Sequence, residues 1–450
     1  MNIIIIGAGK MGLTLVRQLS KEGHNIVVVD NNKKVVEKTV NDFDVMGIYG
    51  NGADHEIQTE AKTQSADLLI ACTSTDEFNI LCCMVAKKLN AEIDTIARVR
   101  NPEYFTLFMS KELGLNMMVN PDYEAAMEIF RILRSPGTIK IEPFSGGKVD
   151  LVEFKLAWDN PLIDTAISDL TSKLQIKTLI CAVQRDEEVI IPKGDFIFRE
   201  NDKIHIIASP KDAHILMKKL GIFKSVAKKV MIIGGSRIAF YLAKQLDKIG
   251  IAVKIVEKNE QKAMELSESL DQAEIIIGDG SDRQVLQEEG LMNVGAVIIL
   301  TGSDEENIMI SLFAGSQKVN KVITKINRLS YYSMLEASGI ESIISPHLLT
   351  ANQIIRYVRG KQNSMGSSVL NLYRIVNDQA EALEFLATKT FAGLSKPLKA
   401  LSIKPNLIIA CILRDNNVIT PHGDQTIEAG DKVIVVTTNE FLDDLNDILN

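Results

Sequence analysis

The chain has 450 residues, which at about 150 residues per domain allows about three domains. Hydrophobic residues make up 46% and charged residues 24%, proportions that are typical of a folded globular protein and exclude a disordered or fibrous one. The net charge of −8 excludes a general electrostatic attraction to nucleic acid or to anionic lipid.

Cysteine and histidine usage argues against a metal centre. The five cysteines show no C-x-x-C spacing, and their odd number predicts reduced thiols rather than a disulfide framework or a zinc site. The six histidines are scattered and form no metal-ligand pair.

The sequence predicts no membrane segment of its own. The N-terminal MNIIIIGAGKMG has no charged n-region and its apolar run stops at Gly7, so it is not a signal peptide. No stretch reaches the roughly 18 apolar residues of a transmembrane helix. We therefore expect a cytoplasmic protein that serves a membrane only by docking onto another component.

The first predicted elements are short β-branched runs that alternate with longer helical patterns. A helix is expected after Gly12, where apolar residues recur at helical spacing until Gly23. Continuous apolar strands separated by helices indicate a parallel sheet that is covered on both faces. The strands are expected at 2–6, 26–30, 45–49, 68–71, 95–99 and 117–119.

The alternation of apolar strands and helices stops at about residue 139 and resumes after a linker. From about residue 139 to about 225, alternating strands at 152–156, 179–184 and 203–208 predict a small α+β lobe. A linker follows at 223–229, and a second βαβ series has strands at 230–233, 253–257, 274–278, 297–300, 322–326 and 342–345. A second alternating region includes strands at 407–413 and 432–437.

The two series are copies of one unit. IIIIG at 3–7 returns as VMIIG at 230–234, GNGAD at 50–54 as GDGSD at 278–282, and TSTDE at 73–77 as TGSDE at 301–305. Near the end of each copy, IPKGD at 191–195 returns as TPHGD at 420–424. All offsets lie between 227 and 229 residues, which indicates an internal duplication.

The duplication predicts the fold class and the domains. We expect an α/β protein with two tandem Rossmann-like, doubly wound parallel sheets, each followed by a small α+β lobe. The expected Rossmann-like domains span 1–137 and 229–362, and the lobes span 138–225 and 363–450.

The first βα junction carries a dinucleotide-binding pattern, G-x-G-x-x-G. It directly follows a strand, opens a helix, and is followed by Asp30 at the end of the next strand. Glycine permits the tight turn and close approach of backbone amides to a pyrophosphate, and the carboxylate would accept hydrogen bonds from ribose hydroxyls and favour NAD over NADP. The predicted contacts are Gly7, Ala8, Gly9, Lys10, Met11, Gly12 and Asp30.

The second copy of this pattern is degraded. Ser236 replaces the second glycine, and we expect its hydroxymethyl group to point into the volume of the pyrophosphate. Ala239 at the third position is tolerated, and Glu257 keeps the ribose-binding carboxylate. Two interpretations stay open, a second nucleotide site and an empty structural copy. The site residues would be Gly234, Gly235, Ser236, Arg237, Ile238 and Glu257.

Further candidates lie at the carboxyl ends of the later strands, where ligands bind in such sheets. Thr73 and Ser74, and in the second copy Thr301 and Gly302, end the fourth strands and would border the ribose and base. Arg98 and Lys325 occupy matching places in the fifth strands and would meet phosphate charge. We expect Asp76 and Asp304 to be N-caps of the helices that follow.

A dehydrogenase needs a proton donor or acceptor beside the nicotinamide. His24 and His55 lie in turn-rich segments without a triad-like companion, and no nucleophile elbow or Walker lysine is present. The sequence therefore predicts a nucleotide pocket without catalytic residues.

In this organisation the chain resembles the peripheral regulatory subunits of Trk potassium uptake systems, the TrkA type, whose two tandem units (RCK N- and C-type domains) regulate potassium conductance. The features that carry the resemblance are IIIIGAGKMG with Asp30, GNGAD, GDGSD, IARVRNPEY and the repeated IPKGD/TPHGD. It implies NAD(H) as cofactor, with ATP or ADP competing for the first fold. Asn51 and Asp279, in GNGAD and GDGSD, are further candidate contacts.

The resemblance further implies a homo-oligomer, expected to be a tetramer, that docks on the inner face of the cell membrane onto a potassium-translocating subunit of the TrkH/TrkG type. Two other interpretations stay open. One is an NAD-dependent oxidoreductase. The other is a regulator that binds a cyclic dinucleotide through its small lobes.

Overall fold

The structure is a computed structural model that describes residues 1–101, 104, 114–134, 140–158, 160–174, 179–186, 188–220, 227–328, 331–338, 340, 342–364, 369–375, 379–415, 417–438, 442 and 444–450. Contacts divide the chain into two units, and each unit is built from both halves of the sequence. One unit comprises Met1–Phe130 and Lys228–Ile355, and the other Arg131–Ala227 and Arg356–Asn450. The four domain boundaries expected from the duplication stay a prediction.

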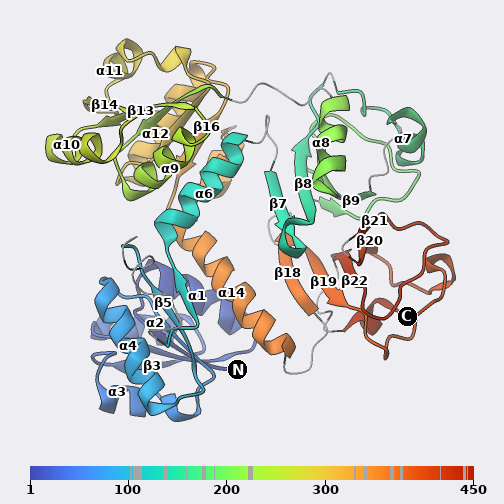
Figure 1. Cartoon of the computed structure of the whole chain (residues 1–450), viewed down its shortest axis with the longest axis horizontal. Helices are drawn as coiled ribbons and strands as arrows, with labels where there is room; N and C mark the ends of the chain where they lie inside the picture. Colours follow the sequence, from blue (N-terminus) through green and yellow to red (C-terminus); the bar gives the residue numbers. More distant parts are fainter. Residues whose placement is uncertain are drawn as a thin grey trace. The chain divides into compact units, whose positions relative to one another are not determined.

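The first unit contains two six-stranded parallel sheets with the same strand order (Figure 1). The orders are β3-β2-β1-β4-β5-β6 and β14-β13-β12-β15-β16-β17. The first sheet is formed by β1 (Asn2–Ile6), β2 (Asn25–Asp30), β3 (Met46–Tyr49), β4 (Leu68–Ala71), β5 (Asp94–Arg98) and β6 (Met117–Val119). The second is formed by β12 (Lys229–Ile233), β13 (Ala252–Glu257), β14 (Glu274–Ile277), β15 (Ala296–Ile299), β16 (Val322–Lys325) and β17 (Ser342–Ile344).

Helices connect these strands as a doubly wound fold requires. In the first sheet they are α1 (Lys10–Lys21), α2 (Lys33–Asp42), α3 (His55–Glu60), α4 (Asp76–Leu89) and α6 (Pro121–Arg134). In the second they are α9 (Arg237–Asp247), α10 (Glu260–Ser269), α11 (Arg283–Glu288), α12 (Asp304–Ser316), α13 (Tyr332–Ala337) and α14 (Pro346–Ser364). The expected fold class, two tandem Rossmann-like sheets with small lobes, is confirmed.

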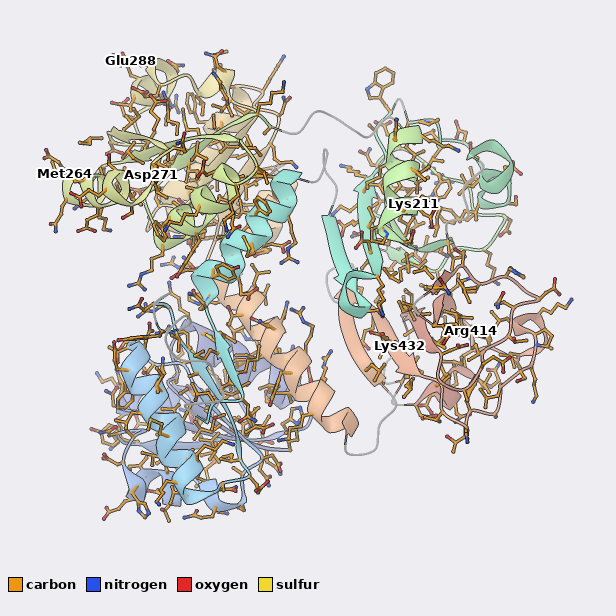
Figure 2. The ribbon with its side chains drawn as sticks, in the orientation of Figure 1. Lys211, Met264, Asp271, Glu288, Arg414 and Lys432 are labelled. Carbon is orange, nitrogen blue, oxygen red and sulfur yellow. The ribbon has the colours of Figure 1, made fainter. Side chains whose placement is uncertain are left out.

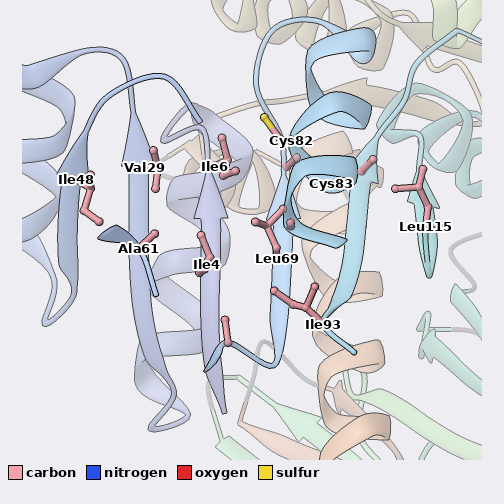
Figure 3. Close-up of a cluster of buried hydrophobic side chains, with 14 of the residues drawn as sticks. Ile4, Ile6, Val29, Ile48, Ala61, Leu69, Cys82, Cys83, Ile93 and Leu115 are labelled. Carbon is pink, nitrogen blue, oxygen red and sulfur yellow. The ribbon is translucent and has the colours of Figure 1, made fainter. Parts of the chain in front are cut away.

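The central parallel strands, such as β4 and β15, are buried on both faces, which explains their unbroken apolar sequences. All four isoleucines of β1 are at most 1% exposed. Figure 3 shows one side of the first sheet, where Ile4, Ile6 and Val29 pack with Leu69 and with Cys82 of α4. This core holds the carboxyl ends of β1, β2 and β4 beside one another.

The second unit contains two antiparallel five-stranded sheets. The first is formed by β7 (Lys140–Phe144), β8 (Val149–Lys155), β9 (Leu179–Arg185), β10 (Glu188–Ile190) and β11 (Lys203–Ala208), with α7 (Ile167–Leu174) and α8 (Pro210–Lys219). The second is formed by β18 (Val369–Ile375), β19 (Ala380–Leu386), β20 (Leu407–Arg414), β21 (Asn417–Ile419) and β22 (Lys432–Thr437). The expected alternating strands are present in both.

One apolar cluster joins the two antiparallel sheets. Residues from β8, β9 and β11 pack in it with residues from β19, β20 and β22. Its fully buried members include Val149, Ala182, Ala382 and Ile434. The two small lobes therefore share a core.

All five cysteines are free and buried, in agreement with the expected reduced thiols. Burial raises the pKa of the Cys72 thiol to about 12. Within the described part of the chain, no helix combines the length and the apolar character needed to cross a membrane.

Candidate functional site

The first glycine loop lies where the strand order of the sheet reverses. β1 pairs with β2 on one side and with β4 on the other, so the loop after β1 opens at the topological switch point. Gly7 has φ +99°, and a Cβ built on it would lie 3.0 Å from the Thr73 amide nitrogen. Glycine is therefore required there both by the backbone conformation and by the close approach of the end of β4.

Gly9 and Gly12 have different surroundings. A Cβ on Gly12 would lie 1.9 Å from the Gly7 carbonyl oxygen, so Gly12 allows the close packing of α1 on the loop. A Cβ on Gly9 would meet nothing within 4 Å. The Gly9 amide also has no hydrogen-bond partner among the described residues. The loop thus presents an open volume and a free N–H group at the N-terminus of α1, the geometry of an anion site.

Asp30 is oriented by the same loop. Its Oδ2 accepts a hydrogen bond from the Ala8 amide at 2.7 Å, and its Oδ1 accepts one from the Asn32 amide at 2.8 Å. The Gly50 amide donates to the Asp30 carbonyl oxygen at 3.0 Å and brings the GNGAD segment alongside. Within that segment the Asn51 side chain is exposed and accepts from the Ala53 amide. The predicted ribose-binding carboxylate therefore borders the glycine loop, while contact of Asn51 with a ligand stays a prediction.

A buried amide that the sequence analysis missed organises the ends of β4 and β5. Asn79 Oδ1 accepts from the Thr73 amide at 2.8 Å and from the Thr73 hydroxyl at 2.7 Å, and Asn79 Nδ2 donates to the Arg98 carbonyl oxygen at 2.8 Å. Asn307 makes the same contacts to Thr301 and Lys325 in the second copy. The offset of 228 residues between the two asparagines was the signal that could have revealed them.

The cationic side chains at the carboxyl ends of the strands donate hydrogen bonds to the end of the fourth strand of each parallel sheet. Arg98 Nη2 donates to the Thr73 carbonyl oxygen, and Arg100 Nη2 donates to that of Ser74. Burial lowers the pKa of Arg98, and the nearby Arg100 lowers it further. Lys325 Nζ donates to the Leu300 carbonyl oxygen at 3.4 Å. These positions place positive charge at the carboxyl edge, while direct contact of Arg98 or Lys325 with phosphate stays a prediction.

The expected N-cap role of Asp76 and Asp304 is wrong. The N-cap residues are Thr75 and Ser303, and both aspartates lie in the first helical turn. Asp76 Oδ2 accepts from the Arg100 and Asn101 amides, each at 2.8 Å. Asp304 holds the corresponding amides of the second copy. Tertiary hydrogen bonds to the segment after the fifth strand replace the local cap.

The second glycine loop has the same turn, with φ +99° at Gly234, but its amides are used internally. The Ser236 amide donates to the Gly234 carbonyl oxygen at 3.0 Å, and Ser236 Oγ accepts from the Ala239 amide as the N-cap of α9. Ser236 thus occupies an amide of the helix N-terminus that a phosphate would otherwise bind. This is a second obstacle to phosphate binding, in addition to the steric hindrance expected from the sequence.

The other second-copy residues keep their places. The Gly235 amide donates to Glu257 Oε2 at 2.6 Å, as Ala8 does to Asp30. The exposed Asp279 accepts from the Ser281 amide, and a Cβ on Gly302 would meet nothing within 4 Å. Met11 and Ile238 are 2% exposed, so their side chains belong to the core and only their backbone can face a ligand. Lys10 and Arg237 each begin a helix.

The second glycine helix packs against the first repeat. The Tyr241 hydroxyl of α9 donates to the Arg100 carbonyl oxygen at 3.0 Å, and Asn120 Nδ2 donates to the Tyr241 hydroxyl at 3.2 Å. Burial raises the pKa of Asp122, while Arg237 opposes that rise. Cations of both repeats therefore act on one edge of the first sheet.

Family models match most of the chain. A model described as the TrkA-N domain matches residues 3–121 and 230–346, and one described as the TrkA-C domain matches 151–221 and 386–450. Trk system potassium uptake protein TrkA homolog 1 of Methanosarcina mazei is 32% identical over 444 residues, 97% of each chain. Trk system potassium uptake protein TrkA of Vibrio alginolyticus is 31% identical over 448 residues, 98% of this chain and 96% of that protein.

Solved structures share the fold. The crystal structure of the GsuK RCK domain matches with a TM-score of 0.65 and 18% identity, covering 98% of this chain and 92% of that one. The GsuK channel bound to NAD matches with a TM-score of 0.65 and 18% identity, covering 98% and 77%.

Proposed function

Since the chain belongs to the TrkA family of Trk system potassium uptake proteins, we propose that it is the nucleotide-sensing regulatory subunit of a potassium uptake system. In this proposal it binds NAD(H), and in competition ATP or ADP, and controls a membrane-embedded potassium-translocating partner of the TrkH/TrkG type. It acts as a homo-oligomer, a tetramer, on the cytoplasmic face of the membrane, and it has no enzymatic activity.

The open volume beside Gly9 carries the proposal. The free Gly9 amide, the positive end of α1 and the oriented Asp30 carboxylate form a set that fits a diphosphate and the adjoining ribose. The NAD-bound GsuK channel, which shares the fold, supports NAD as the ligand. The negative charge of Asp30 opposes a 2′-phosphate and favours NAD over NADP.

Regulation requires that the nucleotide distinguish two arrangements of the assembly. A ligand shifts such an equilibrium only by the difference between its affinities for the two states. A coupling of about 1–3 kcal/mol, or about 5- to 150-fold, is the usual range. The contacts of Tyr241 and Asn120 support this role, because they connect the segment after β5 to the second repeat.

The positions of His24 and His55 favour a regulator over an oxidoreductase. His24 lies 3.4 Å from the N-terminal nitrogen, at the edge of the sheet opposite to the glycine loop. His55 is exposed at the start of α3. Steady consumption of NADH by the purified protein with a small metabolite would contradict the proposal.

Calorimetry with NAD on three chains tests the site. We expect one binding event in the wild-type protein and at least a tenfold weaker affinity in Gly9→Ser, a loss of about 1.4 kcal/mol. A Cβ at this position meets no protein atom within 4 Å, so thermal unfolding should not change. Ser236→Gly is the matched control at the second loop and should gain a second, weaker event. An unchanged affinity in Gly9→Ser would rule out the first site.

The gating proposal needs a flux measurement. Potassium uptake into vesicles that contain the translocating partner should depend on added chain and change with NADH or ATP. The same chain with Gly9→Ser should associate with the partner but lose the response to nucleotide. A response that survives this substitution would place the sensor elsewhere.

A further inference from the structure

His347 occupies an unusual position at the ligand edge of the two parallel sheets. It lies in the first turn of α14, the helix that follows the last strand of the second sheet. Its Nδ1 is shielded from solvent and has no hydrogen-bond partner within the described residues. The charged groups that act on the ring are Lys10 of α1, Arg98 of β5, Lys325 of β16 and Asp304 of α12.

These surroundings keep the imidazole neutral. Burial first, and then the positive charges of Lys10, Arg98 and Lys325, lower the pKa of His347 from 6.5 to about 4, while the Asp304 carboxylate opposes this shift. A buried ring nitrogen without a hydrogen-bond partner is costly in a folded protein, and it marks a place where a ligand can supply the missing partner.

The cations around His347 come from both repeats. Lys10 follows the first glycine loop, and Arg98 at the end of β5 donates to the Thr73 carbonyl oxygen after β4, so both are candidate contacts of the first nucleotide. An anion bound there would neutralise their charge and offer acceptor oxygens at the same edge. Both effects favour the protonated ring, because a nearby negative charge and a hydrogen bond to the charged form each raise the pKa of a histidine.

We infer that His347 is a further residue of the first nucleotide site, contributed by the second repeat, and that it takes up a proton from solvent when the phosphates of the nucleotide bind. This inference rests on the proposed function, since it assumes a nucleotide at the first glycine loop. In this inference, the His347 ring binds the phosphates only when the ring is protonated.

The sign of the pH dependence follows from the two states. The ring has a pKa of about 4 without ligand and a higher one with ligand. Between these values nucleotide binding brings a proton with it, so affinity rises as the pH falls, by about tenfold per pH unit for one whole proton. Above the ligand-bound pKa the affinity does not depend on this group.

NAD is the appropriate probe, because its diphosphate does not titrate near neutral pH. Calorimetry in two buffers of different ionisation enthalpy, at about pH 6.5, counts the protons taken up per bound NAD. The dissociation constant is measured at about pH 6 and about pH 8. The variants are His347→Gln and His347→Asn, which keep a polar planar side chain, and His422→Gln, an exposed histidine of the second small lobe, as control.

We expect proton uptake in the wild-type protein and in His422→Gln. Their Kd should be at least about threefold lower at about pH 6 than at about pH 8, which corresponds to an average uptake of about one quarter of a proton over this pH range. In both His347 variants the uptake and the pH dependence should be lost. Wild-type binding without proton uptake, or uptake that persists in a folded His347 variant, would overturn the inference alone. If the wild-type protein binds no NAD, the nucleotide site of the proposed function fails as well.

Discussion

Among single residues, the glycines of the first loop have two different roles, one in building the loop and one in leaving space for a ligand. The backbone of Gly7 and the packing of Gly12 are needed to build the loop, whereas Gly9 leaves space that the protein itself does not use. Glycine is therefore required for folding at Gly7 and Gly12, and for access of a ligand at Gly9.

Gly12→Ala should destabilise the protein. The new methyl group would lie 1.9 Å from the Gly7 carbonyl oxygen, and the backbone must shift to accommodate it, which costs about 1–3 kcal/mol. Thermal unfolding measures this loss. Gly315→Ala is the matched control, because this exposed helical glycine has open space at its Cβ and should leave stability unchanged or raise it by up to about 1 kcal/mol. Equal effects of the two substitutions would contradict the packing argument.

At the scale of elements, both small lobes use the same ion pair to hold the turn before their last strand. Arg414, which is labelled in Figure 2, lies at the end of β20. It donates to Asp431 through Nε at 2.9 Å and Nη2 at 2.7 Å, and Nη2 also donates to the Thr426 carbonyl oxygen. The side chain of Asp431 is 3% exposed. Arg185 and Asp202 repeat this bidentate arrangement in the first lobe.

Asp431→Ala should therefore lower the stability of the second lobe by about 3 kcal/mol, because it leaves a partly buried guanidinium without its partner. Urea unfolding followed by a probe in that lobe gives the value. Lys399→Ala in the same lobe removes an exposed ion pair with Asp424, and its effect should stay within about 0.5 kcal/mol. A loss below about 1 kcal/mol in Asp431→Ala would show that the pair does not hold the turn.

For the whole molecule, the duplication gives two halves that depend on one another. The parallel sheets meet through Tyr241 and Asn120, and the antiparallel sheets share one apolar cluster. Neither half of the sequence forms a unit alone, since each unit draws on both.

A chain with a protease site inserted between residues 222 and 228 tests this dependence. After cleavage the two halves should remain associated in size-exclusion chromatography, because separation would expose the shared apolar cluster to water. Ala382→Asp, which places a charge at a fully buried position of that cluster, should weaken the association. Ala91→Asp at an exposed position is the control. Separation of the unsubstituted halves would contradict the shared core.

The local elements were predictable because their signals are local. Apolar runs such as Ile3–Ile6, the glycine turn after them and Asp30 at the next strand end are read within a few residues of each other, and the duplication repeats them. The role of Asp76 was mispredicted because its partners, the amides of Arg100 and Asn101, lie 24 and 25 residues away. Asn79 was missed although Asn307 repeats it, because one of its partners, the Arg98 carbonyl oxygen, lies 19 residues away.

Local sequence patterns were enough to predict the two parallel sheets, the small lobes and the place of the candidate phosphate loop, because hydrophobic periodicity and the turn preferences of glycine act over short distances. The folded chain was needed to show that the Asp76 carboxylate holds the Arg100 amide, and that Lys10 and Arg98 of the first repeat act electrostatically on His347 of the second. Such relations depend on how elements far apart in the chain are brought together, and no local pattern encodes which charges will share a buried edge.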